Sequence, residues 1–393
     1  MKSRKNKGYK IQSYGRIFDG SERRRKRRIR NAVIFVLAVL LLVFVGYSIS
    51  GPLSNLLKGE KTERPGDNSS KIPVSSQITS SEITSSEVEG EIDLSKLKTA
   101  YLPLSTASNP EALSSFIANI KSLGYNAAVL QLKDEDGTIY YNTQNAMAAS
   151  VGAVSENAMQ NFSEIIAKLK SENIVPIAQI NAFKDKIATK NSAAKILYTE
   201  HEGWSWFDSA NGKPWLNPYS SEAQGYITAI CCELAELGFE NIMVSSVMFP
   251  DVSNFVNADF GELEKTVSHA EILSQYTQSL KDALSSKNAK LMLNYNAAEA
   301  ARENNVIYGG ANPISFACDV LVPELSVESD SGAALSALIG SVRATHSTAV
   351  LMPKFAPTDS AGVAFTKEQI DAQIAVCAGC GVYVCDKNGN YIE

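Results

Sequence analysis

The sequence contains little histidine. Its 393 residues include three, His201, His269 and His346, and none lies in a recognisable serine–histidine–acid arrangement. A serine hydroxyl near its free pKa is a poor nucleophile without an adjacent base. The sequence therefore gives no support to a serine hydrolase.

Cysteine also supplies no clear metal or redox site. The six cysteines would permit disulfides outside the cell, and Cys377 and Cys380 have the spacing of a redox or metal-binding pair. No second close pair and no histidine ligand accompanies them, and Cys231 and Cys232 fall in a predicted amphipathic helix. We therefore expect the cysteines to act as small buried hydrophobic residues, and we predict no metal and no cofactor.

A glycine-rich phosphate-binding turn is missing after the first predicted strand, which disfavours an open doubly wound sheet, the alternative fold. From Lys98 onward, short apolar runs alternate with helical stretches, a pattern typical of parallel strands joined by crossover helices. The expected strands lie at residues 99–104, 126–132, 175–182, 239–251 (a strand that ends in a loop), 290–295, 319–322, 349–352 and 382–385. Eight strand–helix units in about 295 residues fit a (β/α)8 TIM barrel, an α/β fold.

Charge is unevenly distributed along the chain. The formal net charge is -5, but residues 1–30 hold 13 Lys or Arg against Asp19 and Glu22, a balance of +11, and the remainder carries -16. A basic cluster beside a membrane span more often sets topology and contacts anionic lipid headgroups than it binds nucleic acid. We therefore predict no nucleic-acid partner.

Residues 32–50 carry no charge and have about the length that a membrane-spanning helix needs. The basic tail of residues 1–31 precedes them, so the positive-inside tendency predicts a cytoplasmic amino terminus, one transmembrane helix in the cell membrane and an extracellular carboxy-terminal domain. A secretory signal peptide cleaved near Ser48-Ile49-Ser50 is the alternative. Residues 51–94 are rich in Ser and Thr and are expected to form a disordered linker before the barrel of residues 95–393.

In a parallel barrel, side chains at the carboxyl ends of the strands face a shared mouth where chemistry is done. A glycosidic bond is commonly cleaved by two carboxyl groups on either side of it. The carboxylates that follow predicted strands are Asp134, Glu135, Asp136, Asp185, Asp251 and Glu324. Each of them also fits a loop charge in solvent, so both interpretations stay open.

Four sequence blocks keep the order and spacing of a known pattern. They are VLQLKD at 129–134, QINAFKD at 179–185, WLNPY at 215–219, and GFENI at 238–242 with Phe249-Pro250. Together they resemble a bacterial family of glycoside hydrolase-like TIM barrels of poorly defined substrate, over roughly Leu97 to the carboxy terminus. The resemblance implies a barrel fold and a carbohydrate ligand.

Several charged positions of that family pattern are replaced in this sequence. Gln131, Gln179, Asn217, Ser245, Ser246 and Met248 stand where the family has Asp, Arg, Asp, Asp, Tyr and Arg. The replacements remove acids and bases alike from the expected mouth. The sequence therefore predicts a dismantled ion-pair site.

All three tryptophans lie in the long connection between the third and fourth predicted strands, together with Phe207 and Tyr219. Flat aromatic faces suit the apolar faces of sugar rings, but a long loop also needs a small core of its own, which tryptophan can supply. The candidate substrate-binding residues are Gln131, Lys133, Lys184, Trp204, Trp206, Trp215, Tyr219 and Ser245.

We predict a membrane-anchored, cell-surface barrel that binds envelope or capsule polysaccharide, with hydrolysis left open. As a hydrolase it would use Glu324 as general acid and Asp134 or Asp251 as second carboxylate, about 5–10 Å away. A catalytically inactive glycan-binding pseudoenzyme and an envelope scaffold that docks proteins are the alternatives. The sequence identifies no protein partner.

Overall fold

The computed structural model describes residues 92–302, 305–325, 331–345, 349–355 and 366–384. They lie in the compact unit of residues 88–393. The predicted basic tail, the transmembrane helix at 32–50 and all but the last residues of the linker fall outside these ranges. Within them, no helix is both long enough and apolar enough to cross a membrane.

Eight parallel strands of the described residues close into a barrel. In ring order they are β1 (Lys98–Tyr101), β2 (Ala127–Lys133), β5 (Val175–Asn181), β7 (Asn241–Ser245), β9 (Lys290–Asn296), β10 (Val320–Leu325), β12 (Lys354–Phe355) and β13 (Val382–Val384). β1 pairs with both β2 and β13, and this contact closes the ring. The predicted (β/α)8 barrel is confirmed, and the open doubly wound alternative is wrong.

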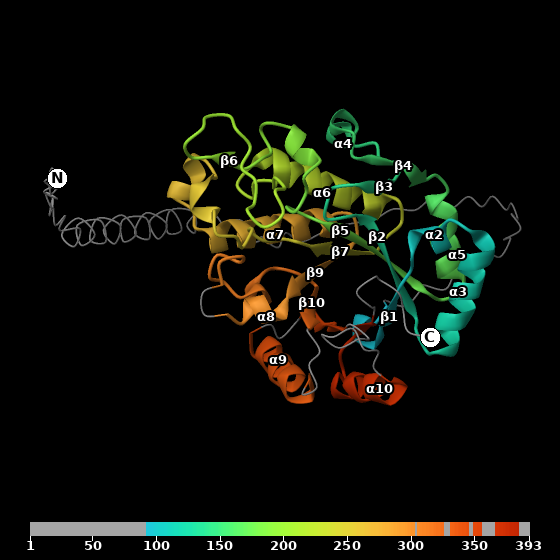
Figure 1. Cartoon of the computed structure of the whole chain (residues 1–393). Coiled ribbons are helices and arrows are strands. Elements are labelled where there is room, and N and C mark those ends of the chain that lie inside the picture. The colour runs from blue at the N-terminus through green and yellow to red at the C-terminus, as the bar shows by residue number, and fades with distance from the viewer. Residues whose placement is uncertain (1–91, 303–304, 326–330, 346–348, 356–365, 385–393) are drawn as a thin grey trace, which may run out of the picture. The chain divides into compact units, whose positions relative to one another are not determined.

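Helices surround the ring (Figure 1). The long ones are α3 (Pro110–Ser122), α5 (Phe162–Ser171), α6 (Ser221–Glu236), α7 (His269–Ser285), α9 (Ser331–Thr345) and α10 (Lys367–Val376). Thr366 and Gln369 form a capping box at the start of α10. The prediction that a full helix follows every strand is wrong for the connection from β9 to β10. The described residues of that connection contain only the short α8 (Ala297–Ala300) and η5 (Pro313–Ser315).

Alternation along the strands separates two apolar layers. On β2, Ala127 and Val129 face the barrel interior, while Ala128 and Leu130 pack against the helices. Burial on both faces explains why the strands are continuous apolar runs in the sequence. Leu94 lies in the short helix η1 (Leu94–Lys96), and Leu97 follows it directly. Both side chains pack with the apolar side chains of the barrel interior, at the amino-terminal ends of the strands.

The loops contain structure that the sequence did not predict. β3 (Ile139–Tyr141) and β4 (Val154–Met159) extend the sheet beyond β2, with α4 (Ala146–Val151) between them. β6 (Leu197–Tyr198) and β8 (Ala258–Asp259) pair with each other and join the loops that follow β5 and β7. The fourth predicted strand, expected to end in a loop within 239–251, is β7, which ends at Ser245.

The close packing of η1 against the barrel generates a first prediction. A Cβ added at Gly381, just before β13, would lie 2.7 Å from the carbonyl oxygen of Leu94 and 3.0 Å from Met352 Cε. Because that oxygen belongs to the backbone, η1 or β13 must shift. We expect Gly381→Ala to lower the free energy of unfolding by about 1–3 kcal/mol.

A matched control is Gly225→Ala on α6, where nothing lies within 4 Å of the added Cβ. It should raise the free energy of unfolding by about 0.5–1 kcal/mol through helix propensity. Urea unfolding of residues 88–393, followed by circular dichroism, measures both variants. Equal stability of the two would contradict the packing argument.

Candidate functional site at the barrel mouth

A chain of uncharged side chains crosses the carboxyl ends of three neighbouring strands. Gln179 Nε2 on β5 donates a hydrogen bond to Ser245 Oγ on β7, at 3.1 Å, and Ser245 Oγ donates to Asn294 Oδ1 on β9, at 2.9 Å. Asn294 Nδ2 in turn donates to the carbonyl oxygen of Val322 on β10, at 3.0 Å. All three side chains belong to buried residues. A buried polar network with its partners in place holds its members rigidly.

A second polar contact lies beside the first. Ser246 Oγ donates to Asn181 Oδ1 at 2.9 Å, and Asn181 Nδ2 donates to the carbonyl oxygen of Lys133 at 3.2 Å. Ser246 has a φ of 57°, a left-handed conformation that is uncommon for a residue with a Cβ. Strained residues of this kind concentrate at functional sites, where the surrounding structure holds them in place. Ser246 is therefore a candidate site residue. The sequence had indicated it only as a replaced position of the family pattern.

The resemblance noted in the sequence implies an arginine at position 179 and an aspartate at position 245, and the structure places these two positions in contact. Positions 179 and 245 touch, so an arginine and an aspartate there would form a buried ion pair. Removing one partner alone would leave a buried charge unpaired, at a cost of about 3–5 kcal/mol. The glutamine–serine hydrogen bond replaces both charges and leaves neither one behind.

Lys133 is not at the solvent-exposed surface. Its side chain is fully buried, and Nζ lies 2.8 Å from Asp185 Oδ2, whose side chain is also fully buried. Nζ donates to the carbonyl oxygen of Asn181 at 2.6 Å. Asp185 Oδ2 has no hydrogen-bond partner among the residues that the structure describes, so its attraction to Lys133 is ionic. The predicted substrate contact of Lys133 is replaced here by an internal ion pair.

Asp185 links the loop after β5 to the loop after β2. Its Oδ1 accepts a hydrogen bond from the amide of Ala188 at 2.7 Å. Gly137, with a φ of 94°, comes so close that an added Cβ would lie 1.9 Å from this oxygen. The interpretation of Asp185 as a loop charge in solvent is wrong, because its carboxylate is buried within the fold.

The other acids after β2 are engaged in local contacts. Asp134 Oδ1 accepts from the amides of Asp136 and Thr138, and Oδ2 accepts from the hydroxyl of Tyr140 at 2.7 Å. Burial, together with this hydrogen bond to Asp134, raises the pKa of Tyr140 to about 12. The carboxylate proposed as a catalytic partner thus organises a turn.

Two further ion pairs surround that turn. Hydrogen bonds from Lys186 and Lys213 lower the pKa of Asp136. Glu135 pairs with Lys184, a candidate substrate-binding residue, at the surface. Both acids therefore match their interpretation as loop charges.

Glu324 is the only carboxylate on the eight described barrel strands. It lies near the end of β10, its side chain is 45% exposed, and it forms an ion pair with Lys354 of β12. β10 lies opposite β2 in the ring, so Glu324 and Asp134 approach the mouth from opposite sides. Asp251 follows β7 by six residues, is half-exposed and lies 3.6 Å from Arg302.

The aromatic candidates divide into two groups. Trp206 and Trp215 are buried, with their indole N–H groups donating to the carbonyl oxygen of Asn254 and to Asp208 Oδ2. Tyr219 is also buried, and its ring packs near Phe249 and Phe260. All three side chains therefore belong to the hydrophobic core. Trp204 is 66% exposed and packs against His201, with ring centroids 4.9 Å apart and the ring planes tilted by 33°.

Gln131 is half-buried on β2 and is in register with Gln179 on β5. The loops after β10, β12 and β13 lie outside the described residues, so the mouth is defined by the loops after β1, β2, β5, β7 and β9. Within the described ranges, no group of three or more His, Cys, Asp or Glu side chains could hold a metal ion.

The cysteines that the structure describes are thiols. Cys231, Cys318 and Cys377 are buried, as expected for small hydrophobic residues. Burial raises the pKa of Cys377 to about 12, which disfavours its reactive thiolate. Cys385 lies outside the described residues.

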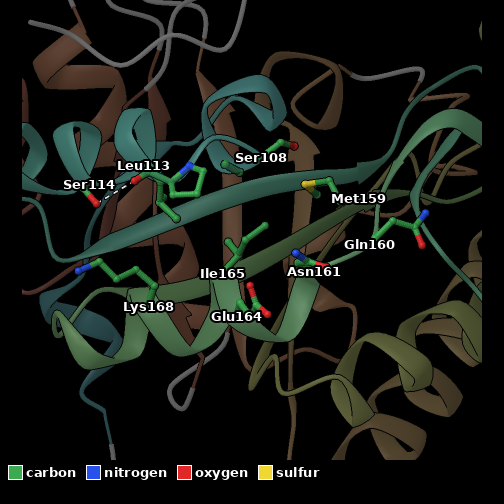
Figure 2. Close-up of a pocket in the computed structure, with 11 residues that line it drawn as sticks. Ser108, Leu113, Ser114, Met159, Gln160, Asn161, Glu164, Ile165 and Lys168 are labelled. Atoms are coloured by element: carbon green, nitrogen blue, oxygen red, sulfur yellow. Dashed lines mark hydrogen bonds between the residues drawn. The ribbon is translucent and has the colours of Figure 1, made fainter.

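A cavity of about 330 Å³ lies in the outer helix layer, away from these residues. Leu113 of α3, Met159 of β4 and Ile165 of α5 form its apolar wall, with Gln160 and Asn161 at one side (Figure 2). None of the predicted site residues lines it.

The buried ion pair generates a prediction about Lys133. Lys133→Met keeps most of the side-chain volume but leaves Asp185 buried and uncompensated, so we expect the free energy of unfolding to fall by about 3–5 kcal/mol. Lys184→Met, which removes a surface ion pair, should change it by less than about 1 kcal/mol. Urea unfolding of both variants is the measurement, and similar losses would refute a structural role specific to Lys133.

A double-mutant cycle tests the contact between positions 179 and 245. Ser245→Asp alone should lower the free energy of unfolding by about 3 kcal/mol, because it buries an unpaired carboxylate. Adding Gln179→Arg should recover at least about 1 kcal/mol through a direct ion pair. Purely additive effects of the two substitutions would mean that the side chains do not interact.

Comparison with known proteins places the chain in a family. Residues 99–325, more than half of the chain, match the family described as "Putative glycosyl hydrolase domain". No curated protein matches the sequence. The family match begins at the second residue of β1 and continues through β10, and it includes each residue of the polar network.

Similar solved structures include three from different organisms. A hypothetical protein from Ruminiclostridium thermocellum is 23% identical, with a TM-score of 0.41, over 47% of this chain and 91% of that one. The GH20 exo-β-N-acetylglucosaminidase of Vibrio harveyi is 12% identical, with a TM-score of 0.47, over 67% of this chain and 42% of that enzyme. Ega3 of Aspergillus fumigatus, solved with galactosamine, is 13% identical, with a TM-score of 0.42, over 77% and 96%. The family match identifies this chain as a member of the "Putative glycosyl hydrolase domain" family.

Proposed function

We propose that this protein binds a cell-envelope or capsule polysaccharide at the barrel mouth without cleaving it. The observation that carries the proposal is the uncharged network of Gln179, Ser245 and Asn294, which occupies the strand ends where a glycosidase would hold charged groups. The function is then that of a glycan receptor built on a hydrolase fold.

The chemistry of glycosidic cleavage supports this choice. Most glycosidases use two carboxyl groups that face each other across the scissile bond. Of the three proposed catalytic residues, Asp134 holds a turn, Asp251 is half-exposed beyond β7, and Glu324 is ion-paired with Lys354. None of the three is aimed at a second carboxylate by a described contact.

The same mouth suits sugar binding. Amide and hydroxyl groups both donate and accept hydrogen bonds, as sugar hydroxyls do. Trp204 adds an exposed aromatic face, of the kind that packs against the apolar face of a sugar ring. Gln131, half-buried on the neighbouring strand, extends the amide surface.

We extend the proposal to cellular placement from the sequence. Residues 32–50 would anchor the protein as a single-pass membrane helix, with the basic tail in the cytoplasm. Residues 51–94 would then tether the barrel outside the cell, within reach of envelope glycans.

Hydrolysis is the second candidate function, and the position of Glu324 favours it. Its carboxylate is accessible and lies at the carboxyl end of a barrel strand, where barrel enzymes place catalytic groups. Glu324 would act as general acid, with Asp134 or Asp251 as second carboxylate.

One experiment separates the two functions. The full chain in detergent micelles is mixed with a panel of bacterial cell-wall and capsule polysaccharides, and bound protein and released reducing ends are measured on the same samples. We expect binding without release. Trp204→Ala should weaken binding about tenfold, equivalent to about 1.4 kcal/mol, and Ser245→Ala should also weaken it.

The controls decide between the outcomes. Val256→Ala removes another strongly exposed apolar side chain and should leave binding unchanged. Release of reducing ends by the unmodified protein, abolished in Glu324→Gln, would establish the hydrolase instead. Absence of both binding and release would reject both functions and favour the envelope scaffold.

A further inference from the structure

A tight turn between α10 and β13 contains two cysteines, Cys377 and Cys380. The amide of Cys380 donates a hydrogen bond to the carbonyl oxygen of Cys377 at 2.8 Å. Gly379 has a φ of 81°, which a residue without a side chain adopts at little cost. A turn closed in this way keeps its first and fourth Cα atoms within about 7 Å of each other. Disulfides join Cα atoms about 4.4–6.8 Å apart, so the backbone separation suits a bridge between these two cysteines.

The two thiols differ in exposure. Cys377 is 2% exposed, and its thiol donates a weak hydrogen bond to the carbonyl oxygen of Gln373, with sulfur and oxygen 3.5 Å apart. Cys380 is half-buried. A reagent in solution therefore reaches Cys380 first, whereas the surrounding fold shields Cys377.

A positive charge lies beside the turn. Nη2 of Arg343, on α9, is 3.5 Å from the position that a Cβ would occupy at Gly379. Burial raises the pKa of the Cys380 thiol, and the Arg343 guanidinium opposes that rise through its charge and a hydrogen bond. Because the thiolate is the reactive form of cysteine, Arg343 favours reaction at Cys380.

We propose that Cys377 and Cys380 form a reversible disulfide site, which reacts with small disulfides by thiol–disulfide exchange. Cys380 is the attacking residue and Cys377 is the residue that completes the bridge. The turn directly precedes β13, at the end of the barrel opposite the mouth, so the proposal is independent of the glycan function.

The exchange has two steps. In the first, Cys380 loses its proton to solvent, and its sulfur attacks one sulfur of the small disulfide. The sulfur–sulfur bond of that molecule breaks, and one half leaves as a thiolate that takes up a proton. The other half remains bound to Cys380 as a mixed disulfide.

In the second step, Cys377 gives up its proton and its sulfur attacks the sulfur of Cys380. The weak hydrogen bond from Cys377 to Gln373 is lost as the thiol rotates toward its partner. The bond to the bound half breaks, and that half leaves as a thiolate and takes up a proton. In total, two protein thiols are oxidised to one disulfide, and the small disulfide is reduced to two thiols.

The test uses the full chain in detergent micelles, with Cys385→Ser as the background. Cys385 lies outside the described residues and shares the tryptic peptide 368–387 with the two cysteines of the turn. Fully reduced protein is freed of reductant, exposed to oxidised glutathione near neutral pH without denaturant, and quenched with N-ethylmaleimide. Mass spectrometry should show that this peptide has lost two hydrogen atoms and carries neither maleimide nor glutathione. Dithiothreitol should restore both thiols.

Single substitutions identify the order of attack. Cys377→Ala should stop the reaction at the mixed disulfide, with glutathione retained on Cys380. Cys380→Ala should leave Cys377 unmodified, because the fold shields it. Arg343→Gln should slow the loss of the Cys380 thiol at least about threefold, since the thiolate loses its positive neighbour. Arg302→Gln removes an exposed arginine that pairs with Glu299 instead, and it should leave the rate unchanged.

Cys231 and Cys232 serve as an internal control in the same samples. They are likewise a buried and a half-buried thiol, but they are adjacent within α6, where neighbouring side chains do not face each other. These two cysteines should therefore form no bridge with each other.

Three results would overturn the proposal. They are no reaction at Cys380, glutathione that persists on Cys380 while Cys377 is present, and modification of Cys377 in Cys380→Ala at the rate of the unmodified pair. Far-UV circular dichroism of each variant separates a loss of reaction from a loss of fold. The result with the pair intact requires no substitution at either cysteine.

Discussion

Closure of the ring by β1 is the constraint on which the rest of the structure depends. Once β1 pairs with β2 and β13, every second side chain on each barrel strand points into a closed interior. This alternation of side chains places methionines and aliphatic residues deep in the barrel. It also brings Gln179, Ser245 and Asn294 into contact at the carboxyl ends of the strands. The polar mouth is therefore a consequence of strand register as much as of residue choice.

The uncharged contents of that mouth avoid the cost of buried charge. If only one member of a buried acid–base pair is removed, the other is left as an unpaired buried ion, which is strongly destabilising. A glutamine–serine hydrogen bond joins the same two positions without any charge. Lys133 and Asp185 differ from this arrangement, because both charges are present and are buried together as an ion pair. The fold thus retains one internal ion pair beneath the loops while the strand ends above the interior carry amides and hydroxyls.

Most barrel strands could be predicted because they are apolar runs preceded by helix-ending glycines, such as Gly124 before β2 and Gly238 before β7. The end of the fourth strand could not be located within residues 239–251, because the apolar pattern continues past Ser245, where Phe249 joins an aromatic cluster with Phe260 and His269. Lys133 was misplaced for a different reason. The register between β2 and β5 shifts between Gln131 and Lys133, and such a bulge redirects the side chain that follows it. No residue pattern in the sequence indicated that shift.

The two ends of the barrel differ in how their buried polar groups are satisfied. At the mouth, each of Gln179, Ser245, Asn294 and Asn181 has a hydrogen-bond partner inside the fold, so a ligand there must add contacts to a network that is already complete. At the amino-terminal end, Asn241 keeps an acceptor without a described partner beside a cavity. A buried acceptor of this kind lowers stability unless something donates to it. The mouth is thus a preformed surface whose polar groups are satisfied, whereas the opposite end leaves one buried acceptor without a described partner.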